Sequence, residues 1–219
     1  GFAYIKLTSF IKNTAKDFEA ALEDHAKKQG AINGLILDLR KNPGGLLDQA
    51  VKVSDMFLSD GIIVSTISRD KNNKEITMAS KKGKYLKFPI IILMNEYSAS
   101  ASEIVAGALQ DNKRALIMGE RSFGKGSVQS IVNIGDGSGL KLTVARYYTP
   151  SGKSIQAEGI VPDLEVEEID AEVFNKTIAK SSVTREKDIQ GHLASDKEKS
   201  ANPSAAGLDA WWKESGLKK

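Results

Sequence analysis

The chain has 219 residues, of which 41% are hydrophobic and 27% charged, and its net charge is +3. This composition is typical of one globular core, or of a core with a tail, and the charge is too small to indicate nucleic acid or an acidic membrane surface as a partner. The sequence has no cysteine, which excludes thiol catalysis and disulfides, and its two histidines, His25 and His192, exclude a histidine-rich metal site.

Neither a signal peptide nor a membrane span is recognised, and the sequence begins on a strand pattern without an initiator Met, so we expect a fragment or processed core.

Strands and helices alternate in the first third of the chain. The predicted elements are a strand (2–7), a helix (15 to about 28, with Thr14 as N-cap and Gly30 at its end), a strand covered on both faces (34–40), a sharp turn (41–45) and an amphipathic helix (46–58).

The middle of the chain continues this pattern and then becomes rich in strands. After a strand (62–67) and a hairpin tip (71–74) come a buried strand (90–94), a helix ending near residue 110, a short strand (115–118), a glycine-bearing loop (119–126) and a hairpin of two strands (128–134 and 140–148). This order predicts an α/β core with an appended β-hairpin region. We place the core at residues 1–165 and a polar, helical extension at 166–219, which Trp211 and Trp212 could dock on the body.

Three alternating serines, Ser98, Ser100 and Ser102, follow the buried strand and precede a helix. A nucleophile at a helix start would face substrate at the positive end of the helix dipole. The alternative is purely structural, because the sequence from Ser100 to Glu103 has the S-x-x-E pattern of a capping box. Neither histidine has a recognisable catalytic setting, so the sequence does not favour a Ser-His-Asp triad.

The loop 119–126 allows two interpretations of Lys125. It is close to the phosphate-binding pattern G-x-x-x-x-G-K-[ST], but Gly126 replaces the hydroxyl residue and the following segment alternates like a strand instead of opening a helix. Lysine can also act as a base, because burial disfavours its charged form. In an extended strand Gln129 would lie on the same side as Lys125 and could orient it without charging it.

Five stretches in order resemble the catalytic core of the carboxyl-terminal processing (tail-specific) serine proteases, which use a Ser–Lys dyad. They are residues 37–46 (LDLRKNPGGL), 98–104 (SASASEI), 119–129 (GERSFGKGSVQ), 147–156 (YYTPSGKSIQ) and 159–163 (GIVPD). The resemblance covers about residues 1–165. By it, Ser100 is the nucleophile, Lys125 is its base, and Gln129 orients Lys125. The backbone amides of Gly45 and Ala101 form the oxyanion hole, for which Gly44 is an alternative to Gly45.

The resemblance implies an α/β superhelix of stacked β-β-α units, shared with Clp-type proteases and crotonases. It also implies an endopeptidase that cleaves polypeptide substrates near their C-terminus through an acyl-enzyme, without cofactor or metal, in the bacterial periplasm or cell envelope. A homo-oligomer is compatible with it. Members of the family carry a PDZ domain, and no segment of this chain resembles one. Two other functions stay open: a scaffold that binds polypeptide tails without cleavage, and crotonase-like thioester chemistry, which would need neither Ser100 nor Lys125.

Overall fold

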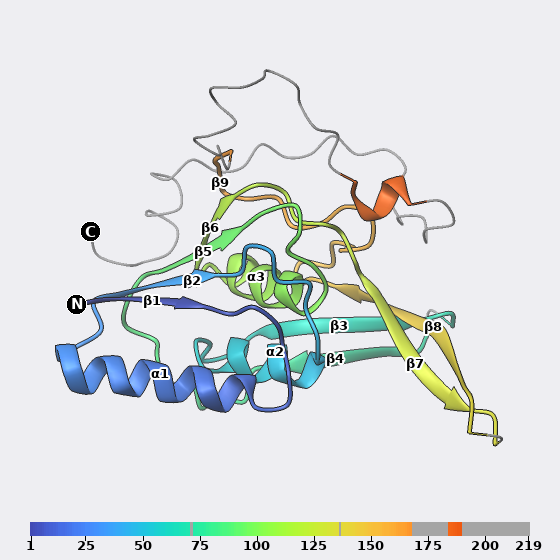
Figure 1. The fold of residues 1–219 in the computed structure, drawn as a ribbon, viewed down its shortest axis with the longest axis horizontal. Coiled ribbons are helices and arrows are strands. Elements are labelled where there is room, and N and C mark those ends of the chain that lie inside the picture. The colour runs from blue at the N-terminus through green and yellow to red at the C-terminus, as the bar shows by residue number, and fades with distance from the viewer. Residues whose placement is uncertain (71, 136, 168–183, 190–219) are drawn as a thin grey trace.

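A computed structural model describes all residues except 71, 136, 168–183 and 190–219 (Figure 1). Its elements alternate between strands and helices up to β3, and the later elements are mainly strands. The elements are β1 (Phe2–Lys6), α1 (Thr14–Gln29), β2 (Gly34–Asp38), α2 (Leu47–Asp55), β3 (Ile62–Ser68), β4 (Lys74–Met78), β5 (Ile90–Met94), α3 (Ala101–Asp111), β6 (Leu116–Gly119), β7 (Ser127–Asn133), β8 (Gly139–Tyr148), β9 (Leu164–Glu165) and the short 3₁₀ helix η1 (Glu186–Asp188). Among the described residues, no helix is both long and apolar enough to cross a lipid bilayer.

A parallel sheet with strand order β1-β2-β5-β6-β9 forms the first layer. The neighbours β2, β5 and β6 are far apart in sequence, yet their carboxyl ends meet at one edge of the sheet. The loops that leave these three strands are the glycine turn 41–45, the serine stretch and the loop of Lys125. In open α/β sheets ligands bind at this edge, so the sheet order alone brings together the three predicted parts of a site.

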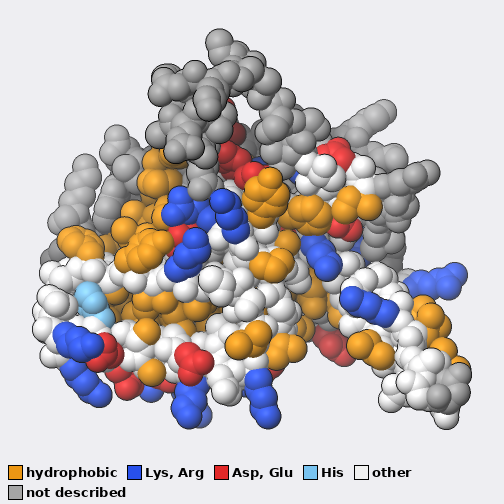
Figure 2. Space-filling view, viewed as in Figure 1, with side chains coloured by type: hydrophobic (Ala, Val, Ile, Leu, Met, Phe, Trp, Pro, Cys, Tyr) orange, Lys and Arg blue, Asp and Glu red, His pale blue; other side chains and the backbone are white. Residues whose placement is uncertain are grey.

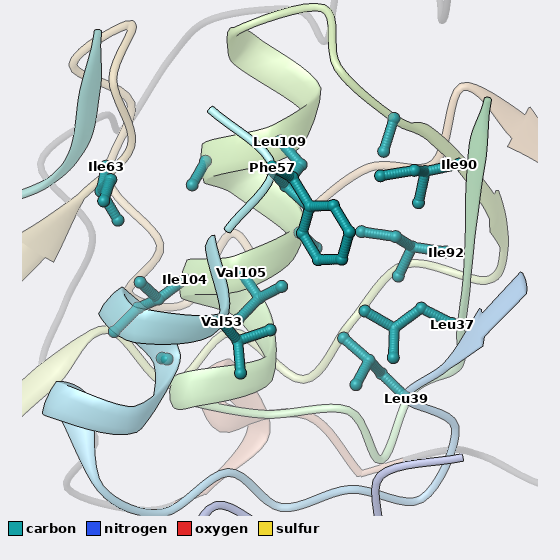
Figure 3. Packing of buried hydrophobic residues seen from close by; sticks show 14 of the residues in the cluster. Leu37, Leu39, Val53, Phe57, Ile63, Ile90, Ile92, Ile104, Val105 and Leu109 are labelled. Atoms are coloured by element: carbon teal, nitrogen blue, oxygen red, sulfur yellow. The ribbon is translucent and has the colours of Figure 1, made fainter. Parts of the chain in front are cut away.

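The core lies between this sheet and the helices (Figure 3). Leu37 of β2 and Ile92 of β5 face Phe57 and the helix α3, whose residues Ala101–Leu109 are all buried. A helix that is buried on every side lies in the interior, and α3 packs against α2, β3 and β6. The helix that begins at the serine stretch is therefore held on several sides, which fixes its first turn.

An antiparallel sheet with order β4-β3-β8-β7 forms the second layer. The hairpin of β7 and β8 projects from the body (Figure 1), and apolar side chains gather over it (Figure 2). The exposed apolar residues of this hairpin are Ile131, Val132, Ile134, Leu140, Leu142 and Val144. The parallel core and this sheet together confirm the expected α/β class with an appended β-hairpin region.

The structure differs from the sequence prediction at the start of α1 and at the end of α2. The N-cap of α1 is Asn13 and not Thr14, which is the first helical residue, with its hydroxyl accepting a hydrogen bond from the Ile11 amide at 2.8 Å. The helix predicted over 46–58 is shorter, because the carbonyl of Met56 accepts from the amides of Lys84 and Tyr85 and the chain turns there. Most of the extension expected at 166–219, including Trp211 and Trp212, lies outside the described residues.

Asp38 fixes the start of the turn that follows β2. Its side chain is fully buried and accepts hydrogen bonds from the Tyr4 hydroxyl at 2.6 Å and from the Arg40 guanidinium at 3.0 and 2.9 Å. Burial alone would raise the pKa of Asp38, but these hydrogen bonds and the charge of Arg40 outweigh it and lower the pKa to about 2. The ionised carboxylate thus ties the end of β2 to its neighbour strand β1.

This arrangement predicts an acid-sensitive contribution to stability. Because the native pKa of about 2 lies below the ordinary 3.8, the unfolded chain binds the proton more readily. The contribution of Asp38 is therefore fully present above about pH 4 and is lost as the pH falls towards 2. We expect Asp38→Asn to reduce the free energy of unfolding at pH 6 by about 1–2 kcal/mol, and less at pH 2.5. Urea unfolding at both pH values measures this. The exposed Asp60→Asn serves as control, and an equal loss at both pH values would contradict the prediction.

Candidate active site

Ser100 is the N-cap of α3 and has φ 55° and ψ −113°. This is a strained conformation for a residue with a side chain, and such strain gathers at functional sites. Ser100 is partly exposed, whereas Ser98 and Ser102 are fully buried. Of the three serines that the sequence could not separate by residue type, only Ser100 is therefore open to a substrate.

The other two serines tie the serine stretch to the turn that follows β2. The hydroxyl of Ser98 donates to the Leu39 carbonyl at 2.9 Å, and that of Ser102 donates to the Asn42 carbonyl at 3.0 Å. The Ala99 amide donates to the same Asn42 carbonyl at 3.0 Å. These bonds support the interpretation of the flanking serines as local scaffolding.

The turn of Gly44 and Gly45 lies directly against the start of α3. A Cβ on Gly44 would stand 2.7 Å from the Ala101 nitrogen and 2.8 Å from the Ser100 Cβ, so only glycine allows this approach. The Gly44 amide donates to the Asn42 side chain at 2.9 Å and is thus occupied. Within the described part of the chain, the amides of Gly45 and Ala101 make no hydrogen bond. This contrast favours Gly45 over Gly44 as the donor that could bind an oxyanion.

The segment 123–126 holds Lys125 by its backbone. All four of its amides donate hydrogen bonds within the protein. The acceptors are the Ser98 carbonyl for Phe123 (3.0 Å), the Glu103 carboxylate for Gly124 (2.7 Å) and for Lys125 (2.9 Å), and the Gln156 side chain for Gly126 (3.0 Å). The side chain of Lys125 is partly exposed, and no carboxylate of the described residues forms an ion pair with it.

Glu103 connects the positions of Ser100 and Lys125. Its Oε2 accepts hydrogen bonds from the Ser100 amide at 2.7 Å and from the Lys125 amide at 2.9 Å. The distance between the two backbone nitrogens therefore cannot exceed the sum of these two distances. Glu103 Oε1 accepts from the Ser122 hydroxyl at 2.6 Å and from the Gly124 amide. Burial raises the pKa of Glu103 to about 7, against the effect of these four donors. The sequence indicated only the capping bond to Ser100, because the other donors lie about twenty residues further along.

We expect Glu103→Gln to impair both stability and activity. The amide NH₂ of glutamine would meet donors where the carboxylate offers only acceptors, which costs about 2–4 kcal/mol in the free energy of unfolding. Displacement of the Ser100 or Lys125 backbone would reduce the kcat of the peptide hydrolysis that the family resemblance implies by about 10- to 100-fold. Urea unfolding and peptide hydrolysis measure the two effects, with the exposed Glu23→Gln on α1 as control. Full activity of the Glu103→Gln variant would show that Glu103 does not position these residues.

The remaining predictions concern Gln129, the phosphate-binding pattern and a metal site. Gln129 lies exposed in β7, which begins two residues after Lys125. The pairing with β8 shifts register between Val128 and Gln129, and the extra residue, Val144, lies on β8. The orienting role of Gln129 stays a prediction. The loop of Lys125 leads into the strand β7 and not into a helix, so the phosphate-binding interpretation fails. Among the described residues, no group of three or more acidic or histidine side chains could hold a metal ion.

Comparison with known proteins shows the family of this chain. The family model described as peptidase family S41 matches residues 1–166. A carboxy-terminal-processing protease of Bartonella bacilliformis is 48% identical over 89% of this chain and 45% of its own length. A carboxyl-terminal-processing protease of Synechocystis is 40% identical over 88% of this chain and 43% of its own length.

A solved structure is also similar. It is titled photosystem II D1 C-terminal processing protease, and it superposes with a TM-score of 0.69 at 40% identity, covering 75% of this chain and 42% of its own. This likeness confirms the fold class expected from the sequence. The chain spans less than half the length of these relatives.

Proposed function

Because this chain belongs to peptidase family S41, we propose that it is the catalytic part of a serine endopeptidase that cleaves proteins near their C-terminus. The proposed nucleophile is Ser100 and the proposed base is Lys125. The observation that carries this assignment is the shared Glu103 oxygen, which accepts hydrogen bonds from the backbone amides of both residues.

The proposed reaction passes through an acyl-enzyme. Neutral Lys125 accepts the proton of the Ser100 hydroxyl while its oxygen attacks the peptide carbonyl, and it then delivers the proton to the leaving amine. The amides of Gly45 and Ala101 stabilise the oxyanion of the tetrahedral intermediate. Water then attacks the ester carbon, with Lys125 again as base, which releases the acid and restores Ser100.

Two features of the described residues support the assignment. Ser100 is the one partly exposed serine of the three, and it has the strained backbone typical of a nucleophile set on a sharp strand-to-helix turn. The amides of Gly45 and Ala101 have no acceptor within the described chain, while their neighbours Gly44 and Ser100 do. Since the matched relatives include bacterial and chloroplastic processing proteases, the periplasm or cell envelope is the proposed compartment.

Incubation with an unfolded protein tests this function. Mass spectrometry should find fragments, and a fluorophosphonate should add to the tryptic peptide that contains Ser100. Absence of fragments together with absence of the adduct would favour a scaffold that binds polypeptide tails. An adduct on another residue would refute the assignment of Ser100.

A further inference from the structure

The loop of Lys125 is held on its second side by a buried glutamine. Gln156 is fully buried, and its Oε1 accepts a hydrogen bond from the Gly126 amide at 3.0 Å. A Cβ on Gly126 would stand 2.3 Å from the Gln156 nitrogen, so the two backbones touch. The amide that directly follows Lys125 therefore depends on this one side chain.

Gln156 is in turn held by Glu186, from the stretch 184–189 that follows the undescribed residues 168–183. Its Nε2 donates to Glu186 Oε1 at 3.2 Å. The Glu186 backbone amide also donates to the Phe123 carbonyl at 3.3 Å. The 3₁₀ helix η1 thus contacts the loop of Lys125 on both flanks, directly at Phe123 and through Gln156 at Gly126. It lies beside this region in Figure 1.

The chemistry of the two side chains makes this contact directional. A glutamine amide can present either its oxygen or its NH₂ group to Gly126, and only the oxygen can accept from the Gly126 amide. An ionised carboxylate only accepts, so Glu186 selects the orientation in which the NH₂ group faces it. Without Glu186 the Gln156 amide could rotate, which would leave the Gly126 amide facing a donor.

We propose that Gln156 and Glu186 are positioning residues for Lys125, so that the stretch 184–189 sets the geometry of the base. This inference rests on the proposed function of Lys125. It differs from the role of Glu103, which accepts from the two preceding amides, Gly124 and Lys125. Two independent acceptors thus hold three consecutive amides, and one of them depends on a residue far along the chain.

An exchange of donor and acceptor tests the proposal. Gln156→Glu keeps an oxygen towards Gly126 but places a second carboxylate against Glu186. We expect kcat to fall by about tenfold or more with KM changed by less than about twofold, because the base is displaced and substrate binding is not. The double variant Gln156→Glu/Glu186→Gln restores the hydrogen bond with its polarity reversed. It should recover kcat to within about threefold of the unsubstituted protein.

A second measurement does not depend on activity. Hydrogen–deuterium exchange of the peptide covering residues 123–126 should be faster in Gln156→Glu and normal again in the double variant. The exposed Glu75→Gln on β4 is the matched control and should change neither quantity. If the unsubstituted protein shows no hydrolysis, the proposed function fails, and exchange alone decides whether Gln156 and Glu186 hold the loop. Normal exchange and normal kcat in Gln156→Glu, or no recovery in the double variant, would overturn the inference.

Discussion

The Ser100→Ala variant is expected to lose about 10⁴- to 10⁶-fold in kcat, because it lacks the oxygen of the proposed nucleophile, which would form the acyl-enzyme. The loss should occur without unfolding. The Ser100 amide, which donates to the Glu103 carboxylate, is retained in alanine. Residual hydrolysis should reflect only binding and the oxyanion hole.

The decisive measurements are hydrolysis of an unfolded protein and the thermal unfolding midpoint. The exposed Ser130→Ala on β7 is the matched control and should behave like the unsubstituted protein. Robust cleavage by Ser100→Ala at an unchanged midpoint would refute the assignment. A lowered midpoint calls for comparison at a temperature where both proteins are folded, and equal activity there would refute it as well.

Replacement of Lys125 should be nearly as severe. Lys125→Ala removes the proposed base, for which we expect a loss of about 10²- to 10⁴-fold in kcat. Lys125→Arg should fail equally, because a guanidinium keeps its charge and cannot accept the serine proton. The backbone bonds of the loop remain in both variants, so the fold should be intact.

The Lys125→Arg variant distinguishes two roles of Lys125, that of a base and that of a positive charge that binds substrate. If Lys125 only attracted a carboxylate of the substrate, Lys125→Arg would retain most activity and Lys125→Ala would mainly raise KM. The rate of phosphonylation of Ser100 gives a second readout, since it depends on removal of the serine proton and not on polypeptide binding. Lys141→Arg, an exposed position on β8, is the control. An arginine variant with more than about a tenth of the normal kcat would contradict the role of base.

Much of the fold follows from local patterns in the chain. The apolar runs before the serine stretch and before the glycine turn predict buried strands, and both are strands of the parallel sheet. The order of the strands in the sheet, in contrast, cannot be predicted from local patterns. The adjacency of β2, β5 and β6 depends on crossovers through helices and not on any local pattern. The three parts of the site were therefore identifiable one by one, and only their resemblance to a family suggested that they meet.

The site also contains parts that local patterns could not reveal. Glu103 has the sequence signature of a cap, yet most of its hydrogen bonds go to residues of another loop. The register shift opposite Val128 and Gln129 places an extra residue, Val144, on β8, which no local pattern of β7 predicts. The contact of Glu186 with Gln156 joins residues separated by 30 positions, a span that no local pattern covers.

The backbone conformation of Ser100 sets thermal stability against activity at this position. At φ 55° a side chain is strained, and glycine would adopt this conformation at lower energy. A Ser100→Gly protein should therefore resist thermal unfolding at least as well as the Ser100→Ala protein, although neither has the hydroxyl of the proposed nucleophile. Screening this protein for thermal tolerance alone would thus favour loss of its hydroxyl. A search for more robust variants has to score turnover alongside heat resistance.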